Sequence, residues 1–470
     1  MLLSKTKAGS LLFQLIFIIL LVLFLFVLMG DDNSLAEVLK YLVIVQFVLC
    51  LYTNYAINRW LYNIYGIFLA LLFVFIISRV VLDVVNYSDF GQTSFFSSYI
   101  FSKNIQVSML TTIFISLASL NIGFILNGKH SCNYLGYQQN RSQVLLFYGK
   151  LLVAIGLIPT FASTLWVAYI VAKYGYLATF LNPELFSTPL IISIGAMFFP
   201  LGFLFCHLGN LQGKKLLLLI NVLFFSSVII EVAVGKRGPV LTQLLVLLWF
   251  FAFKTGRWYS LKKMSILAII MIVGSQASLT IRSGKQTDLA DLFGLFFYQQ
   301  GVSVQLLGYA EQYNISDNYD FSALDLLRPV YQNLDKFWYK ISGQVYDYSP
   351  PERMKKYNNY SMIISNRVDR NKFENGFGLG GSYLVELKLI FGYAGLVIFN
   401  IIIGYLLSRV EYYCQRSFYL FCVLFLTLPT IIYMPRSYIM EFANTQMRPV
   451  ILFFLCIALI KLTRRTKVPS

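Results

Sequence analysis

The chain has 470 residues, of which 58% are hydrophobic and only 13% charged, with a formal net charge of +17. Soluble domains carry about 25% charged residues, so the composition excludes an ordinary soluble domain and indicates a polytopic membrane protein. The basic excess does not indicate a nucleic-acid-binding domain, because residues 282–380 hold eleven basic and eleven acidic residues and are neutral. The excess lies in the apolar remainder, as is typical of charges that orient membrane helices.

Apolar runs along the chain predict an all-α fold with twelve membrane spans, since a bilayer is crossed by about 20 apolar residues. Asp31-Asp32-Asn33 follows the first run where a cleavable signal peptide would need small residues, so we expect a retained helix. The predicted spans are residues 11–29, 39–56, 63–83, 106–126, 146–171, 188–206, 216–234, 239–254, 264–281, 383–408, 417–434 and 449–462.

Lys and Arg residues are distributed unequally between the loops of this topology. One alternate set of loops holds seventeen of them, and the opposite short loops hold six. Because cytoplasmic loops are enriched in Lys and Arg, we expect both termini to be cytoplasmic and residues 282–380 to be extracytoplasmic.

The chain is therefore divided into spans one to nine (residues 1–281), a large loop (282–380) and spans ten to twelve (381–470). Apolar spacing predicts helices over Asp288–Tyr309 and Ala323–Lys340 of the loop. We expect a partly helical cap over the membrane domain.

Four arginines lie near the outer ends of spans, against the orientation rule: Arg79, Arg237, Arg282 and Arg436. They could reach outward to lipid headgroups. Because a guanidinium binds phosphate oxygens with two parallel hydrogen bonds, the group also suits an anionic ligand. The cap adds Arg328, Arg353, Arg367 and Arg370, for each of which surface ion pairing is the alternative.

Two carboxylates at the outer side are candidate bases. Glu386 lies one turn into the tenth span, and Glu441 follows the eleventh. Ionisable residues inside membranes are costly and suggest function. The alternative for Glu386 is an ion pair with Lys388 or with an arginine of a neighbouring span.

The sequence has no signature of a zinc site, a nucleotide-binding loop or a zinc-protease motif. The two histidines, His130 and His207, fall in the expected cytoplasmic part, and the six cysteines form no CxxC pair. No Walker loop, GxGxxG or HExxH motif occurs. We expect no metal and no cofactor.

The chain resembles the Wzy family of O-antigen polymerases, whose plan of about twelve spans and one large outer loop is GT-C-like and shared with O-antigen ligases. The stretches that carry the resemblance are Leu72–Asp83, Gly235–Pro239 (GKRGP), Tyr298–Ser303 (YQQGVS), Gly380–Leu387 (GGSYLVEL), Phe391–Gly395 and Met434–Arg436.

The resemblance implies a glycosyltransferase of the bacterial inner membrane that needs neither metal nor nucleotide. Its substrate would be oligosaccharide linked to undecaprenyl diphosphate, among membrane lipids at the periplasmic face. The growing glycan would move from its lipid to the non-reducing end of a new lipid-linked repeat unit. A chain-length regulator of the same pathway is the expected protein partner, and nucleic acid is not a partner.

Roles follow for the candidate residues. Arg237, Arg282 and Arg436 would bind diphosphate, and Glu386, or Glu441 in its place, would accept the proton of the attacking hydroxyl. The remaining candidates would line the site or contact glycan and phosphate: Arg79, Gln300, Ser303, Arg328, Arg367 and Arg370.

Two other functions stay open. A flippase for the same lipid-linked unit would suit twelve spans, but it would need charge at mid-membrane instead of at the outer rim. A ligase would keep the chemistry and change the acceptor to lipid A core, but the related ligases rely on a histidine in the large loop, and residues 282–380 contain no histidine.

Overall fold

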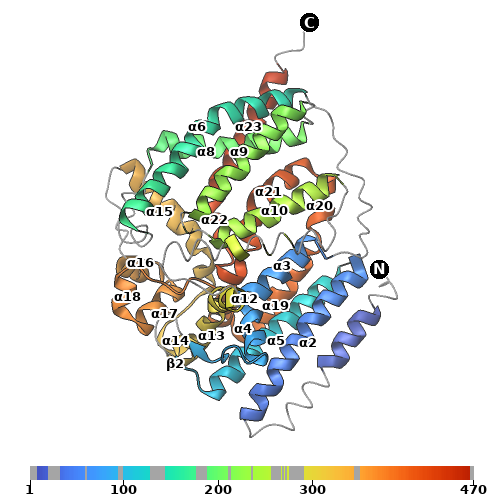
Figure 1. Cartoon of the computed structure of the whole chain (residues 1–470), viewed down its shortest axis with the longest axis vertical. Coiled ribbons are helices and arrows are strands. Elements are labelled where there is room, and N and C mark those ends of the chain that lie inside the picture. Colours follow the sequence, from blue (N-terminus) through green and yellow to red (C-terminus); the bar gives the residue numbers. More distant parts are fainter. Residues whose placement is uncertain are drawn as a thin grey trace. The chain divides into compact units, whose positions relative to one another are not determined.

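The computed structural model describes residues 8–18, 32–58, 61–93, 99–127, 143–175, 188–209, 213–233, 235, 237–255, 266, 269, 272–274, 291–342 and 350–465. Its elements are helices, apart from one antiparallel pair of short strands, β1 (Gln92–Thr93) and β2 (Tyr99–Ile100) (Figure 1). The described residues form two compact units. The first draws on residues 1–133, 285–416 and 431–441, and the second on 134–284, 417–430 and 442–470.

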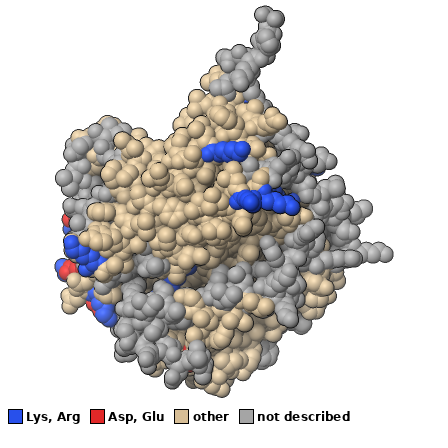
Figure 2. All heavy atoms as spheres, turned by 45° about the horizontal axis from the view of Figure 1, so that its top comes forward, with Lys and Arg blue, Asp and Glu red and all other residues tan. Residues whose placement is uncertain are grey.

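Nine helices in the described ranges are long and apolar enough to cross a membrane. They are Asp32–Asn58, Ile64–Val84, Lys103–Leu126, Gln143–Tyr174, Ile191–Leu208, Lys214–Val232, Arg237–Thr255, Tyr383–Leu407 and Phe418–Arg436. Each coincides with a predicted span, which confirms an all-α, multi-pass membrane protein. Most of the described surface in Figure 2 is uncharged, as lipid-facing helices require.

The other three predicted spans have different outcomes. The first is described as helix Ala8–Ile18, and its remainder lies outside the described residues. The ninth, 264–281, falls almost entirely outside them. The twelfth coincides with α23 (Met447–Arg465), which is not among the nine candidate spans and carries basic residues near both ends.

The first unit contains helix Ala8–Ile18 and two further sets of elements. The first set is α2 (Asp32–Asn58), α3 (Ile64–Leu72), the π-helical turn η1 (Phe73–Ile77), α4 (Ser78–Val84), the two strands and α5 (Lys103–Leu126). The second set is α12 (Leu292–Gln300), η4 (Gly301–Val304), α13 (Gln305–Gln312), α14 (Ile315–Asn318), η5 (Ala323–Leu327), α15 (Arg328–Ser342), α16 (Pro350–Tyr357), α17 (Tyr360–Val368), α18 (Arg370–Glu374), α19 (Tyr383–Leu407), α20 (Val410–Arg416) and η6 (Met434–Arg436).

Helices α5 and α19 pack backbone against backbone in this unit. A Cβ atom at Gly123 would collide with the carbonyl oxygen of Ile401, and one at Gly404 with that of Leu120. Without a hydrophobic drive between helices in lipid, small residues that allow such close approach favour association. The pair forms the frame on which the first turn of α19 is held.

Helix α19 is broken at Gly392, whose φ of 65° and ψ of −161° are not helical. This backbone conformation is essentially restricted to glycine. The sequence predicts one continuous span over 383–408, and the structure instead has two helical pieces joined across a kink at Gly392. The first piece carries Glu386 and Lys388.

The described part of the loop 282–380 is helical, in agreement with the predicted helices. α12, η4 and α13 cover Leu292–Gln312, and η5 and α15 cover Ala323–Ser342. Side chains cap the first turns of α17 and α18: Asn359 accepts hydrogen bonds from Ser361 N and Met362 N, and Asp369 accepts one from Lys372 N. Such caps satisfy amide groups that a helix leaves unpaired at its first turn.

A polar network joins helix Ala8–Ile18 to α2 and α5. Gln14 and Gln46 exchange amide hydrogen bonds of 2.9 and 3.2 Å, and Asn121 Nδ2 donates to Gln14 Oε1 at 2.8 Å. All three side chains are buried. Buried amides between membrane helices must find such partners, because lipid offers none.

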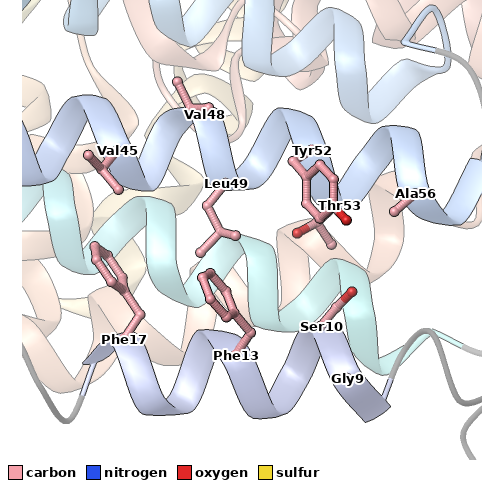
Figure 3. A pocket seen from close by; sticks show the side chains of 10 residues that line it. All are labelled: Gly9, Ser10, Phe13, Phe17, Val45, Val48, Leu49, Tyr52, Thr53 and Ala56. Atoms are coloured by element: carbon pink, nitrogen blue, oxygen red, sulfur yellow. The ribbon is translucent and has the colours of Figure 1, made fainter.

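An apolar pocket of about 710 Å³ lies beside this network. In Figure 3, Phe13 and Phe17 of the first helix face Val45 and Leu49 of α2 across it. None of the described residues that line the pocket is charged. The pocket is therefore not included in the candidate site.

The second unit contains α6 (Gln143–Tyr174), α8 (Leu190–Leu208), α9 (Lys214–Ala233), α10 (Arg237–Thr255), α21 (Phe418–Ile431), α22 (Glu441–Thr445), which starts on the last residue of the first unit, and α23. Its centre is aromatic. The Phe203 ring stacks on Phe224 at 4.2 Å and on Phe425 at 6.2 Å between centroids. Helices α6 and α8 pack closely, because glycines on both helices lie against the backbone of the other.

Candidate functional site

Glu386 is the fully buried acid at the centre of the candidate site. It lies in the first turn of α19, and its side chain has 0% of its surface exposed. Oε1 accepts a hydrogen bond from Arg328 Nη2 at 3.3 Å, and Oε2 accepts one from Ile439 N at 2.8 Å. The carboxylate therefore joins three segments that are far apart in sequence.

The predicted alternative for Glu386 is corrected in one respect. In the described ranges an ion pair exists, but its partner is Arg328 from the loop and not Lys388 or an arginine of a neighbouring span. Lys388 Nζ instead contacts Glu311 Oε1 at 2.5 Å and donates to Ser108 Oγ at 2.9 Å. The reason is helical geometry, because residues two positions apart point to opposite sides of α19.

Arg328 is the first residue of α15 and is 2% exposed. Its Nη2 also donates to the Asp325 carbonyl at 3.1 Å. The guanidinium lies 5.5 Å from the ring centroid of Tyr360 and 5.0 Å from that of Tyr438. Among the described residues, neither Nε nor Nη1 has a hydrogen-bond partner. Two buried donors beside a carboxylate are thus available to an acceptor such as a phosphate oxygen.

Tyr360 holds the entry to α19 in position, and Tyr438 is hydrogen-bonded to the start of α17. Tyr360 Oη donates to Ser382 O at 2.9 Å and accepts from Ser382 N at 2.8 Å. Tyr438 Oη donates to Asn359 Oδ1 at 2.9 Å. Burial raises the pKa of both phenols, so they stay neutral. Glu386, Arg328, Tyr360, Tyr438 and Ile439 are together called the Glu386 cluster below.

Arg436 and Gln300 are brought together by η6 and α12. Arg436 Nη1 donates to the Gln300 carbonyl at 2.8 Å, and its guanidinium lies 5.5 Å from the Phe75 ring centroid. Gln300 contributes its backbone here, which the sequence could not indicate. Because η6 is three residues before Ile439, Arg436 belongs to the segment that donates to Glu386.

Arg79 and Ser303 are buried in a separate junction of the first unit. Arg79 donates to the carbonyls of Gln92 and Tyr298, and its guanidinium lies 3.9 Å from the Tyr298 ring centroid. Ser303 is 0% exposed in η4. Arg79 connects α4 to β1 and α12. Its side chain therefore does not reach outward to lipid headgroups, which was the alternative that the sequence allowed.

The two outer cap arginines have surface partners. Arg367 Nε donates to Tyr319 Oη at 3.3 Å, and Arg370 Nε pairs with Glu374 Oε1 at 2.7 Å. Both side chains are exposed. No contact in the described part of the chain joins either one to the Glu386 cluster.

Three candidates remain. Arg237 begins α10 in the second unit, just after Gly235, whose φ is 97°. Arg282 lies outside the described residues. Glu441 begins α22, and its charge contributes to the raised pKa of Tyr438.

Sequence reasoning missed the tyrosines of the cluster and the Lys388–Glu311 pair. Tyr438 stands two residues after the Met434–Arg436 stretch and could have been considered with it. Tyr360 and Glu311 lie in helices of the loop with no local signal that distinguishes them from packing residues.

The comparisons with known proteins agree with these features. The family model described as O-antigen polysaccharide polymerase Wzy matches residues 11–467, nearly the whole chain. Neither a curated protein nor a solved structure matches. A multi-pass helical protein whose sequence fits that model from its first predicted span to its last helix belongs to the Wzy family of O-antigen polysaccharide polymerases, enzymes that act on lipid-linked oligosaccharide repeat units.

Proposed function

We propose that the protein polymerises O-antigen repeat units at the periplasmic face of the bacterial inner membrane. It transfers the growing glycan from undecaprenyl diphosphate to the non-reducing end of a new lipid-linked unit. The family match over nearly the whole chain carries this proposal. The distribution of Lys and Arg supports the periplasmic side and the cytoplasmic position of both termini.

The leaving group makes the reaction possible without nucleotide or metal. The bond between the anomeric carbon and the diphosphate oxygen breaks, and a bond to the acceptor hydroxyl oxygen forms. The hydroxyl proton goes to a base, and negative charge develops on the departing lipid diphosphate. Cationic donors fixed around that charge stabilise the transition state.

Arg328 and Arg436 are the proposed diphosphate ligands within the first unit. Arg328 has two buried donors without a partner among the described residues, and Arg436 is fixed by the Gln300 carbonyl. Arg237 and Arg282 are proposed as further diphosphate ligands because their guanidinium groups suit phosphate oxygens. Arg79 and Ser303 would support the site, and Arg367 and Arg370 would contact the glycan.

Glu386 is the proposed base, with Glu441 as the second candidate. Both Glu386 oxygens are engaged, by Arg328 and by Ile439 N. Base catalysis requires a free oxygen within hydrogen-bond reach of the hydroxyl. We propose that arriving diphosphate draws the Arg328 guanidinium away from Oε1. Substrate binding would then expose the base only when a leaving group is present.

The test is reconstitution of the purified protein with a synthetic lipid-diphosphate repeat unit, with EDTA and without nucleotide, followed by sizing of the products. A ladder spaced by one repeat unit is expected. Movement of the lipid between leaflets without a ladder would contradict the proposal and favour a flippase. Transfer to lipid A core with no ladder would favour a ligase.

A further inference from the structure

Helix α15 has an apolar face that nothing in the described structure covers. Its five largest exposed residues are Leu327, just before the helix, Tyr331, Leu334, Phe337 and Trp338, between 37% and 65% exposed. Exposed contiguous apolar surface of this kind marks a contact with a membrane, a ligand or a partner.

The spacing of these residues places them on one face of the helix. Leu327, Tyr331, Leu334 and Trp338 follow at intervals of four, three and four residues, which places them on one side of a helix. Lys336 stands half a turn away from this side, and Asn333 is 7% exposed against the unit. The helix is amphipathic, with polar residues away from the exposed apolar face.

The depth of α15 follows from its ion pair. Its first residue, Arg328, contacts Glu386, which lies in the first turn of the candidate membrane span Tyr383–Leu407. One helical turn rises about 5.4 Å, so α15 starts within about one turn of the end of a span. That is the depth of the membrane interface.

The direction of α15 agrees with this depth. In Figure 1, α15 runs across the direction of α2 and α5, which belong to the same unit and are candidate spans. A helix that starts at the interface and crosses the direction of the spans extends along the membrane surface.

We propose that α15 is an interfacial helix whose apolar face, defined by Leu327, Tyr331, Leu334, Phe337 and Trp338, is inserted among the lipids of the leaflet that borders the Glu386 cluster. Trp and Tyr are enriched at the headgroup level because one part of each ring system is apolar and another polar. An amphipathic helix with basic and aromatic residues binds such an interface.

This contact has a consequence for Arg328. Because the guanidinium is on the first residue of α15, insertion of the helix fixes the height of Arg328 relative to the headgroups. The diphosphate of a lipid-linked substrate lies at the same height. The lipid contact itself does not depend on the reaction that the protein catalyses.

The test measures the depth of two matched positions in the full-length protein. Leu334→Cys and Lys336→Cys are each made after Cys132 is replaced by Ser, since the other five cysteines are buried. Each variant carries a nitroxide label in bilayers of phosphatidylethanolamine and phosphatidylglycerol. Accessibility to oxygen, which partitions into lipid, is compared with accessibility to a water-soluble nickel chelate.

We expect the oxygen-to-nickel ratio at position 334 to exceed that at 336 several-fold. High nickel accessibility at 334 would overturn the proposal and leave the face in water, available to glycan. Low accessibility to both reagents would also overturn it and indicate a covering protein. Photo-crosslinking from a diazirine amino acid at position 337, with lipid as the expected product, checks the result without a nitroxide.

Discussion

The ion pair between Arg328 and Glu386 can be removed one partner at a time or as a pair. The side chains are 2% and 0% exposed, and Nη2 lies 3.3 Å from Oε1. Removing one partner of a buried pair costs about 3–5 kcal/mol, because an uncompensated charge is left behind, whereas replacing both by neutral groups is often nearly neutral. We expect Glu386→Gln and Arg328→Met each to lower the free energy of unfolding by about 3–5 kcal/mol. The double variant should have a smaller decrease in the free energy of unfolding than either single variant.

The assay combines stability with activity. Unfolding free energies of the four proteins in bilayers give the coupling energy, and the reconstituted ladder assay gives polymerisation. Arg370→Met is the control for stability, since that arginine pairs with Glu374 on the exposed surface, and we expect no measurable change in its free energy of unfolding. If the double variant loses the sum of the two single losses, the pair is not coupled and the reasoning is refuted. A folded double variant that still makes a full ladder would exclude Glu386 as the base.

Three further predictions concern other parts of the chain. Arg237→Ala should abolish long chains while the protein stays inserted and folded; chain lengths like those of the wild type would contradict its role. Gly392→Ala should lower the free energy of unfolding by about 1–3 kcal/mol because of its backbone conformation, whereas Gly378→Ala, in open space and without a positive φ, should leave it unchanged. Burial raises the pKa of Asp335, but hydrogen bonds from Lys356 and Tyr357 outweigh this effect, so the pKa is lowered overall. The stabilisation from this partly exposed pair, about 1 kcal/mol or less, should be complete above the unfolded pKa, disappear as the pH falls through the lowered pKa, and be absent in Asp335→Asn when melting is followed against pH.

The spans were predictable because the signal is local. A run of about 20 apolar residues must be helical in lipid, whatever its neighbours are. Nine predicted spans therefore coincide with helices of the described structure. The break at Gly392 was not predictable, because membrane helices tolerate glycine and only the backbone angles distinguish a break from a continuous helix.

The candidate site was predictable as residues but not as contacts. Glu386 stands out because an acid is rare inside a span, and Arg328 because it occurs in an aromatic loop. Arg328 and Glu386 are 58 residues apart in sequence and lie in different helices, so no local pattern predicts that they pair. The same holds for Gln300, whose carbonyl, not its side chain, meets Arg436. Whether these residues carry the roles given to them stays a prediction.

The amide network of the first helix has a consequence for biosynthesis. Gln14 obtains its partners from Gln46 and from Asn121, which is synthesised 107 residues later. Until then, Gln14 has only Gln46 of these two partners, and the surrounding lipid acyl chains accept no hydrogen bonds. Helix Ala8–Ile18 should therefore remain near the insertion machinery until α5 emerges. A truncation or fusion that removes Gln14 would take the shortest amide partner from both Gln46 and Asn121, and it should impair membrane insertion before any effect on catalysis.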